Sequence, residues 1–212
     1  MIKFTGFGER AVEFYDGLVV DNSRSYFAAH KSVYQVDVEQ PMRALLEELS
    51  EEFGAGHLFR PHRDVRFSKD KSPYKDHQGG YVEHSEGIGY YVQLSSEGLL
   101  AAAGWWSPQP EQLARFRAAL DGPRAPHLAR ELDGFMRQGF LLDGPMLATR
   151  PRGVPADHPY LELMRRKNMT ASRTFSAPSW IFEPKALAHV RQTWQELTPL
   201  VELLSELVEP VG

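Results

Sequence analysis

The hydrophobic period of this chain changes near Leu58, and that change limits the folds it can adopt. From Ala11 to Phe53, apolar residues recur every three or four positions, as on the buried side of amphipathic helices. From Leu58 to Trp106 they alternate, and β-branched and aromatic residues become more frequent, as in strands. Because strands follow helices instead of alternating with them, the pattern predicts an α+β protein.

The expected elements of the first half are bounded by turn and cap residues. Asp21 to Ser23 end one helix and can cap the next, and Pro41 marks a join between later helical segments. The alternation from Gly87 to Leu94 and again from Leu99 to Trp106 predicts a hairpin, with Ser96-Glu97-Gly98 as its loop. Residues 101–104, three alanines and a glycine, are weak strand formers. We therefore expect something to approach them closely, a packed helix in preference to a bound group.

The second half mixes shorter elements. Two helices are expected over residues 110–122 and 128–139, short strands within 140–150, and a short helix after Pro159. Residues 168–180 are irregular or form one strand. A last helix starts near Pro184 and carries an apolar stripe that fits core packing better than a partner seam, and Pro199 is expected to kink or restart it.

We therefore expect one domain over residues 1–212, because the chain contains no linker or internal repeat and its apolar content of 42% suffices for one core. A central antiparallel sheet would pack against N-terminal and C-terminal helices. The expected parts are helical 9–55, sheet 58–106, mixed helix and strand 107–182, and C-terminal helix 184–208.

Composition excludes several classes of function. A net charge of −4 and a pI near 6.1 argue against general nucleic-acid binding. The absence of cysteine excludes disulfides, thiolate catalysis, and cysteine zinc or iron–sulfur sites. No apolar run fits a signal peptide or a membrane span, so the expected location is the cytoplasm. The pattern specifies neither a cofactor nor an oligomeric state.

Residues 60–77, RPHRDVRFSKDKSPYKDH, are the most basic part of the chain. They hold six of its 24 Lys and Arg in 18 of 212 residues, where even spreading would give about two. Residues 60–67 alternate like a strand, and residues 68–75 resemble a loop around Pro73. Arginine holds phosphate or carboxylate with two parallel hydrogen bonds, and lysine adds a point charge. The segment therefore predicts an anion site formed by Arg60, Arg63, Arg66, Lys69, Lys71, Tyr74 and Lys75.

The alternative for the same segment is an internal network of ion pairs with Asp64, Asp70 and Asp76. Strand alternation separates Arg63 from Arg66, since residues three apart point to opposite faces. Arg63 shares its face with Val65 and Phe67, so we expect it to be half-buried and held by a carboxylate. Arg66 lies on the more polar face, where we expect it to contact ligand.

A metal-dependent enzyme is a third and weaker hypothesis. His62 and Asp64 could supply two ligands of a two-histidine, one-carboxylate iron site, with His77 or His84 as the third. The low strand count argues against the usual β framework of such sites. His30 fits a core histidine, and the chain has no G-x-S-x-G nucleophile motif.

Aromatic residues could wall a groove beside the basic segment, as suits a nucleotide or sugar phosphate. Alternation allows only one of Tyr90 and Tyr91, and only one of Trp105 and Trp106, to join Tyr81 there. A second cationic patch would complete the site or be ordinary surface; it consists of Arg150, Arg152, Arg165, Arg166 and Lys167.

The run RDVRFSKDKSPYK resembles the signature of an uncharacterised family catalogued as domain of unknown function 2461. The resemblance continues through FTGF at residues 4–7, GYY at 89–91, GWW at 104–106 and DHP at 157–159. It implies a single soluble domain and supplies no activity, cofactor or catalytic residue. Two classes of function therefore remain: a pocket protein or enzyme acting on a phosphorylated or carboxylated small molecule, and a non-catalytic structural or interaction domain.

Overall fold

The computed structural model describes residues 3–66 and 69–208. It contains one six-stranded antiparallel sheet with strand order β1-β2-β3-β4-β6-β5, together with helices from both ends of the chain. The α+β prediction is therefore confirmed. The strands are β1 (Gly56–Leu58), β2 (His77–Ser85), β3 (Ile88–Ser95), β4 (Gly98–Trp105), β5 (Leu141–Asp143) and β6 (Met169–Phe175).

The chain divides into two compact units, each assembled from segments far apart in the sequence. The first unit comprises Met1–Glu83, Tyr90–Ala101 and Thr174–Thr193, and the second comprises His84–Gly89, Ala102–Arg173 and Trp194–Gly212. We describe each unit by itself. The expectation of a single domain remains a prediction.

The helices of the first unit are α1 (Ala11–Val20), α2 (Arg24–Ala29), α3 (Lys31–Val33), the π-helix η1 (Tyr34–Glu39), α4 (Gln40–Phe53) and the 3₁₀ turn η2 (Ser179–Phe182). Ser23 caps α2, because its hydroxyl accepts a bond from the Tyr26 N–H at 3.1 Å. Pro41 lies where the π-helix η1 passes without interruption into α4, so its missing N–H coincides with the change from π to α hydrogen bonding. The predicted cap and the predicted join are both confirmed.

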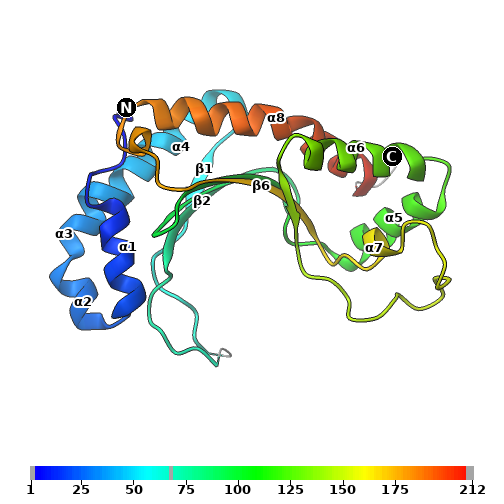
Figure 1. The fold of residues 1–212 in the computed structure, drawn as a ribbon, viewed down its shortest axis with the longest axis horizontal. Helices are drawn as coiled ribbons and strands as arrows, with labels where there is room; N and C mark the ends of the chain where they lie inside the picture. The colour runs from blue at the N-terminus through cyan, green and yellow to red at the C-terminus, as the bar shows by residue number, and fades with distance from the viewer. Residues whose placement is uncertain (1–2, 67–68, 209–212) are drawn as a thin grey trace. The chain divides into compact units, whose positions relative to one another are not determined.

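One face of β1 and β2 packs against α4. Leu46 lies so close to Gly56 and Gly80 that a side chain at either glycine would collide with it. Phe53 contacts Tyr90 edge-to-face at 4.9 Å on the same side. Figure 1 shows α4 on one side of these strands and the chain 59–76 leaving on the other side. The opposite face of β1 and β2 carries the site described below.

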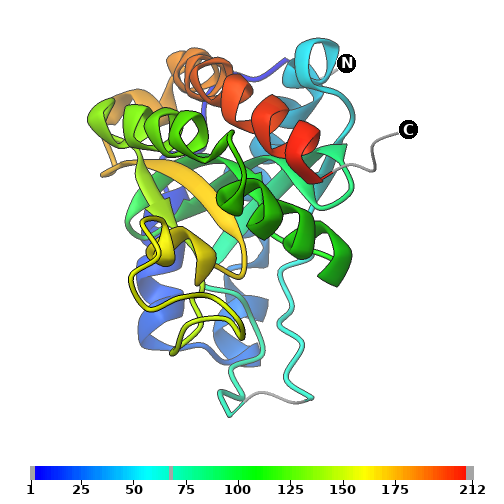
Figure 2. The same ribbon diagram turned by 90° about the vertical axis from the view of Figure 1, so that its right-hand side faces the viewer.

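The second unit contains α5 (Pro110–Asp121), α6 (Ala125–Arg137), α7 (Leu161–Met164) and the larger part of α8 (Lys185–Val208). Two ion pairs connect α8 to its neighbours: Arg124 to Glu206 at 3.3 Å and Arg173 to Glu196 at 2.6 Å. Figures 1 and 2 show α6 and the C-terminal part of α8 on the same side of β6.

Two details correct the sequence predictions, and a third adds to them. The sheet extends beyond residues 58–106, since β5 and β6 join it at the β4 edge. The last helix continues through Pro199 without a restart. At Gly104 the backbone of β6, which the sequence did not indicate, is a close neighbour, because a Cβ there would collide with the Met169 carbonyl oxygen.

The apolar stripe of the last helix is core. Val190, Trp194, Leu197, Val201, Leu204 and Val208 are all 0% exposed. Within the described residues, no helix is both long enough and apolar enough to cross a membrane.

Candidate anion site on the basic segment

The basic segment is a long loop whose two arms pair at one place. His62 and Tyr74 form an antiparallel bridge, flanked by hydrogen bonds from Arg63 N–H to the Pro73 carbonyl at 2.9 Å and from Lys75 N–H to the Pro61 carbonyl at 2.8 Å. The predicted strand over residues 60–67 is therefore wrong in residues 60–66, apart from this bridge; Phe67 lies outside the described residues.

Local side-chain hydrogen bonds explain why the ladder stops. Asp64 accepts the Arg66 N–H at 3.2 Å, and Asp70 accepts the Ser72 N–H at 2.9 Å. These bonds use backbone donors that a strand would need for its partner. Pro73 has no N–H to contribute, so the arms separate beyond the bridge.

Tyr74 fixes the loop to the helical part of the first unit. Its ring stacks on Phe27, and its backbone N–H and carbonyl both bond to the Asn22 side chain at 3.1 Å. Only 8% of Tyr74 is exposed. Among the predicted site residues, Tyr74 thus serves as an anchor for the loop.

Arg63 holds the loop together from inside, as the sequence predicted. Its side chain is 29% exposed, bonds to Asp70 through Nη1, and lies 4.0 Å from Asp76. Hydrogen bonds from Ser72 and the charge of Arg63 lower the pKa of Asp70. Burial opposes ionisation of Asp76, yet bonds and charge from His77 and the charge of Arg63 leave its pKa below the ordinary value.

Arg66 and Lys71 are also engaged within the segment. Arg66 donates two hydrogen bonds to the Asp64 carboxylate, from Nε at 3.0 Å and from Nη2 at 2.7 Å, and its side chain is 77% exposed. This pairing lowers the pKa of Asp64. Lys71 donates to the Val65 carbonyl at 2.9 Å. The guanidinium of Arg66 faces the Asp64 carboxylate, and contact between Arg66 and a ligand stays a prediction.

Arg60, Lys69 and Lys75 differ from the other cations. Among residues 3–66 and 69–208, none of the three forms an ion pair with a carboxylate. Lys69 and Arg60 are exposed, and Lys75 is half-buried with Nζ 4.7 Å from the centre of the Phe59 ring. Burial lowers the pKa of Lys75, and the nearby charge of Arg60 lowers it further. Arg60 and Lys75 therefore form a pair of like charges that no carboxylate bridges.

A short aromatic row lies beside this pair. Phe59 and Tyr81 stack at 5.0 Å, and Tyr81 and His57 stack at 5.1 Å. Tyr91 stands 6.3 Å from Phe59, whereas Tyr90 is buried on the α4 side of the sheet. The predicted separation of the two tyrosines is thus observed.

The two tryptophans of the predicted groove belong to the second unit. Trp105 is 1% exposed and Trp106 is half-buried, so this pair too divides between core and surface.

The base of the loop depends on Gln78, which the sequence did not single out, and on Asn22, which it placed only at the end of a helix. Gln78 is 1% exposed and accepts a bond from the Tyr34 hydroxyl at 2.7 Å. Its amide nitrogen donates to the carbonyls of Phe59 and Gly79 at 2.7 and 2.9 Å. Gln78 and Asn22 thereby hold the two ends of the loop, and neither belongs to a charged or periodic pattern that would reveal it.

The metal hypothesis gains no support from the geometry. Asp64 is bonded to Arg66, and the His62 ring lies 5.1 Å from that of Tyr74. Within the part of the chain that the structure describes, no group of three or more His, Asp or Glu side chains is placed to hold a metal ion.

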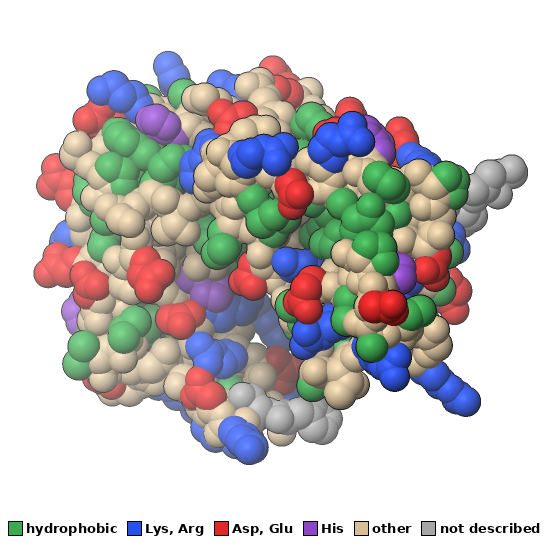
Figure 3. Space-filling model, turned by 45° about the vertical axis from the view of Figure 1, so that its right-hand side comes forward, with side chains coloured by type: hydrophobic (Ala, Val, Ile, Leu, Met, Phe, Trp, Pro, Cys, Tyr) green, Lys and Arg blue, Asp and Glu red, His purple; other side chains and the backbone are tan. Residues whose placement is uncertain are grey.

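The charges of the face drawn in Figure 3 are mixed. Lys and Arg side chains alternate there with Asp and Glu side chains, and neither sign covers the face alone. An anion site on this face would therefore be a local arrangement of a few side chains.

Comparison with known proteins identifies one family. Its sequence model, described as "Conserved hypothetical protein (DUF2461)", matches residues 10–203. The matched range includes the whole basic segment and begins after the FTGF of residues 4–7. No curated protein and no solved structure matches the chain.

Proposed function

The chain belongs to the DUF2461 family of conserved hypothetical proteins, and we propose that it binds a small organic anion, a phosphate or a carboxylate, between Arg60 and Lys75. The observation that carries this proposal is the unbridged pair of like charges beside an aromatic ring. An anion between the two cations would remove their repulsion and accept hydrogen bonds from both.

The surrounding loop favours binding because it is already ordered by other contacts. The bridge at His62, the anchor at Tyr74 and the Arg63–Asp70 pair hold the two arms together. A ligand would therefore need to order little more than the two cationic side chains, which reduces the entropic cost of binding.

The aromatic row narrows the ligand class. Phe59 is 38% exposed and stacks with Tyr81, so a ligand held at Arg60 and Lys75 could lay a ring against this row. An anion that carries an aromatic group should bind better than inorganic phosphate. We propose binding only and assign no reaction to the site.

Calorimetry at constant ionic strength tests the proposal. The wild-type protein should bind phenyl phosphate saturably and more tightly than inorganic phosphate. Arg60→Ala and Lys75→Ala should each weaken binding about tenfold or more, because each removes a charged hydrogen bond. Arg66→Ala is the matched control. It should bind phenyl phosphate nearly as tightly as the wild type does, because the Arg66 guanidinium is already paired with Asp64.

The alternative function is a purely structural network of charges, and the pairs Arg63–Asp70 and Arg66–Asp64 favour it. In that case no anion would stabilise the folded wild-type protein. An Arg66→Ala variant that loses as much affinity as Arg60→Ala would equally overturn the assignment to Arg60 and Lys75.

A further inference from the structure

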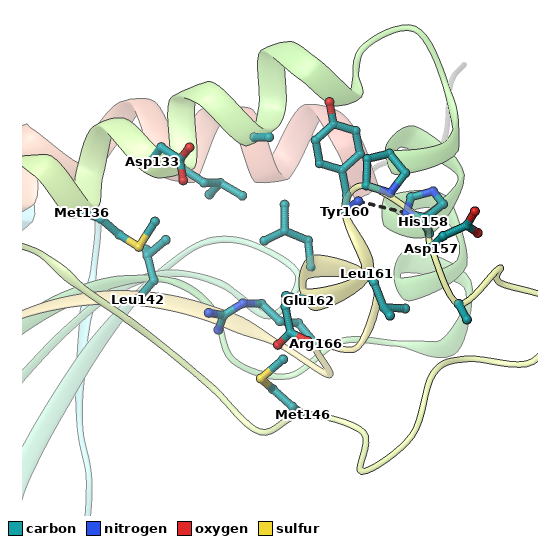
Figure 4. Close-up of a pocket in the computed structure, with 15 residues that line it drawn as sticks. Asp133, Met136, Leu142, Met146, Asp157, His158, Tyr160, Leu161, Glu162 and Arg166 are labelled. Carbon is teal, nitrogen blue, oxygen red and sulfur yellow. Dashed lines mark hydrogen bonds between the residues drawn. The ribbon is translucent and has the colours of Figure 1, made fainter.

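The second unit contains a cavity that is independent of the basic segment. Its volume is about 640 Å³, and its walls come from α6, β5, the chain 156–163 and Arg166. Ligand pockets commonly measure about 300 to 1,000 Å³, so this one can hold a small organic molecule. Figure 4 shows the residues that line it.

Most of the wall is apolar. Leu132 and Met136 come from α6, Leu142 from β5, and Met146, Leu161 and Leu163 from the chain that follows. Met136 is 49% exposed, so part of its side chain is accessible at the pocket wall. Methionine adapts its shape readily, so Met136 and Met146 suit a flexible hydrocarbon ligand.

Arg166 reaches this cavity because its backbone is paired. Met146 and Arg166 form an antiparallel bridge, flanked by bonds from Leu147 N–H to the Arg165 carbonyl at 2.7 Å and from Lys167 N–H to the Pro145 carbonyl at 2.8 Å. Arg165 ends α7 with helical φ and ψ of −76° and −16°, whereas Arg166 follows it in the bridge.

The two adjacent arginines consequently have different surroundings. Arg165 donates to the Leu147 carbonyl at 3.0 Å and to Glu162 at 2.9 Å. Arg166 extends among the pocket residues (Figure 4) and forms no ion pair with any carboxylate of the described chain. Arg166 as a whole is half-buried, and its guanidinium has N–H donors that an anion can accept from.

His158 shapes the pocket wall without offering a reactive nitrogen. Its Nδ1 accepts the Tyr160 N–H at 3.1 Å, so the proton of the neutral ring resides on Nε2, which lies 3.0 Å from Asp121. Only 8% of the His158 side chain is exposed. Both ring nitrogens are thus occupied, and the pocket favours binding over acid–base chemistry.

The acidic side chains on the pocket wall favour a ligand that carries a single negative charge. Asp133, Asp157 and Glu162 also line the pocket, and Glu162 already balances Arg165. A dianion such as a phosphate monoester would meet this negative charge, whereas a single carboxylate is balanced by Arg166. We infer that this pocket binds an apolar monocarboxylate, with its carboxylate on Arg166 and its hydrocarbon against Leu132, Met136 and Leu142.

Calorimetric titration of the full chain with octanoate tests this inference. The wild-type protein should bind octanoate saturably, and 1-octanol and inorganic phosphate should bind at least tenfold more weakly at this site. Arg166→Gln should lower the affinity for octanoate at least tenfold, and Arg166→Lys by less, because lysine keeps the charge but loses the two parallel hydrogen bonds. Lys167→Ala is the matched control: it removes the same charge one residue away, outside the wall.

A second variant keeps the test valid if Arg166 variants fail to fold. Met136→Glu adds a negative charge at a half-exposed wall position and should weaken octanoate binding through repulsion. The inference is overturned if the wild type shows no saturable binding, if octanol competes as well as octanoate, or if Lys167→Ala loses as much affinity as Arg166→Gln. The same titrations in an Arg60→Ala background exclude binding at the basic segment, and the octanoate binding that depends on Arg166 should persist there.

Discussion

The ring of Tyr74 lies flat on the ring of Phe27, with centroids 4.0 Å apart and planes inclined by 6°. Phe27 belongs to α2, and Tyr74 lies in the loop between β1 and β2. The contact therefore fixes a charged loop, which has little apolar surface of its own, to the helical core of the first unit.

Loss of this contact should destabilise the protein and loosen the loop. Tyr74→Ala removes a buried aromatic ring and should lower the free energy of unfolding by about 3 kcal/mol or more, measured by urea denaturation. Tyr74→Phe retains the stacking and should cost less than about 1 kcal/mol. The anchor assignment fails if limited proteolysis cuts residues 60–76 equally fast in the wild type and in Tyr74→Ala.

Arg63 and Arg66 should differ in their effect on stability. Arg63→Ala removes the cation that Asp70 and Asp76 share. It should lower the free energy of unfolding by about 1 kcal/mol, because water screens this pair only partly. Arg66→Ala removes an exposed pair and should leave the melting temperature nearly unchanged. Thermal denaturation of both variants tests these roles. Equal shifts of the melting temperature would contradict a structural role for Arg63 alone.

The same carboxylates predict acid sensitivity. The folded protein holds the pKa values of Asp70 and Asp76 below the ordinary value of about 3.9, so the folded state binds fewer protons than the unfolded state. Their contribution to stability is thus complete above that pH and is lost as the pH falls through the lowered values. Urea denaturation between pH 2 and 6 should show this decline. The decline should be smaller in Asp76→Asn, and equal slopes in both proteins would count against the assignment.

Gly104 should tolerate no side chain. Its φ is +143°, and a Cβ would collide with the Met169 carbonyl of β6. Gly104→Ala should therefore cost about 3 kcal/mol, because backbone on both sides must move. Gly134→Ala is the comparison: it lies within α6, its nearest neighbour would be 3.9 Å away, and alanine should stabilise the helix by up to about 1 kcal/mol. Similar unfolding midpoints for the two variants would show that the approach of β6 is not tight.

The fold was predictable where local patterns decide structure. The helical period before Phe53 and the alternation of the hairpin both follow from which face of an element is buried, and that information lies in neighbouring residues. The pairing of β6 with β4 and the approach of Met169 to Gly104 depend on residues distant in the sequence. The glycine signalled a close neighbour, but no local pattern names that neighbour.

The site was predictable to a similar depth. Composition identified the basic segment, and the apolar neighbours of Arg63 indicated its half-buried position. The alternative of an internal ion-pair network included Asp64 among the partners of the arginines, and the structure shows the Arg66–Asp64 pair. The sequence did not specify which arginine would pair with which carboxylate. The proximity of Lys75 to Arg60 and Phe59 arises only when the two arms meet at the bridge of His62 and Tyr74.

Anion binding at Arg60 and Lys75 should weaken at high pH earlier than an ordinary lysine would allow. Burial and Arg60 lower the pKa of Lys75 below the usual value of about 10.4, so Lys75 loses its proton at a lower pH while Arg60 stays charged. Above pH 7.5, where phenyl phosphate is already a dianion, its affinity should fall at a lower pH than the ordinary pKa of lysine would give, as calorimetry at constant ionic strength would measure. Lys75→Arg supplies the control, because arginine keeps its charge throughout this range and should hold the affinity nearly constant. A decline of equal size in the wild type and in Lys75→Arg would assign the titration to another group and would remove Lys75 from the site.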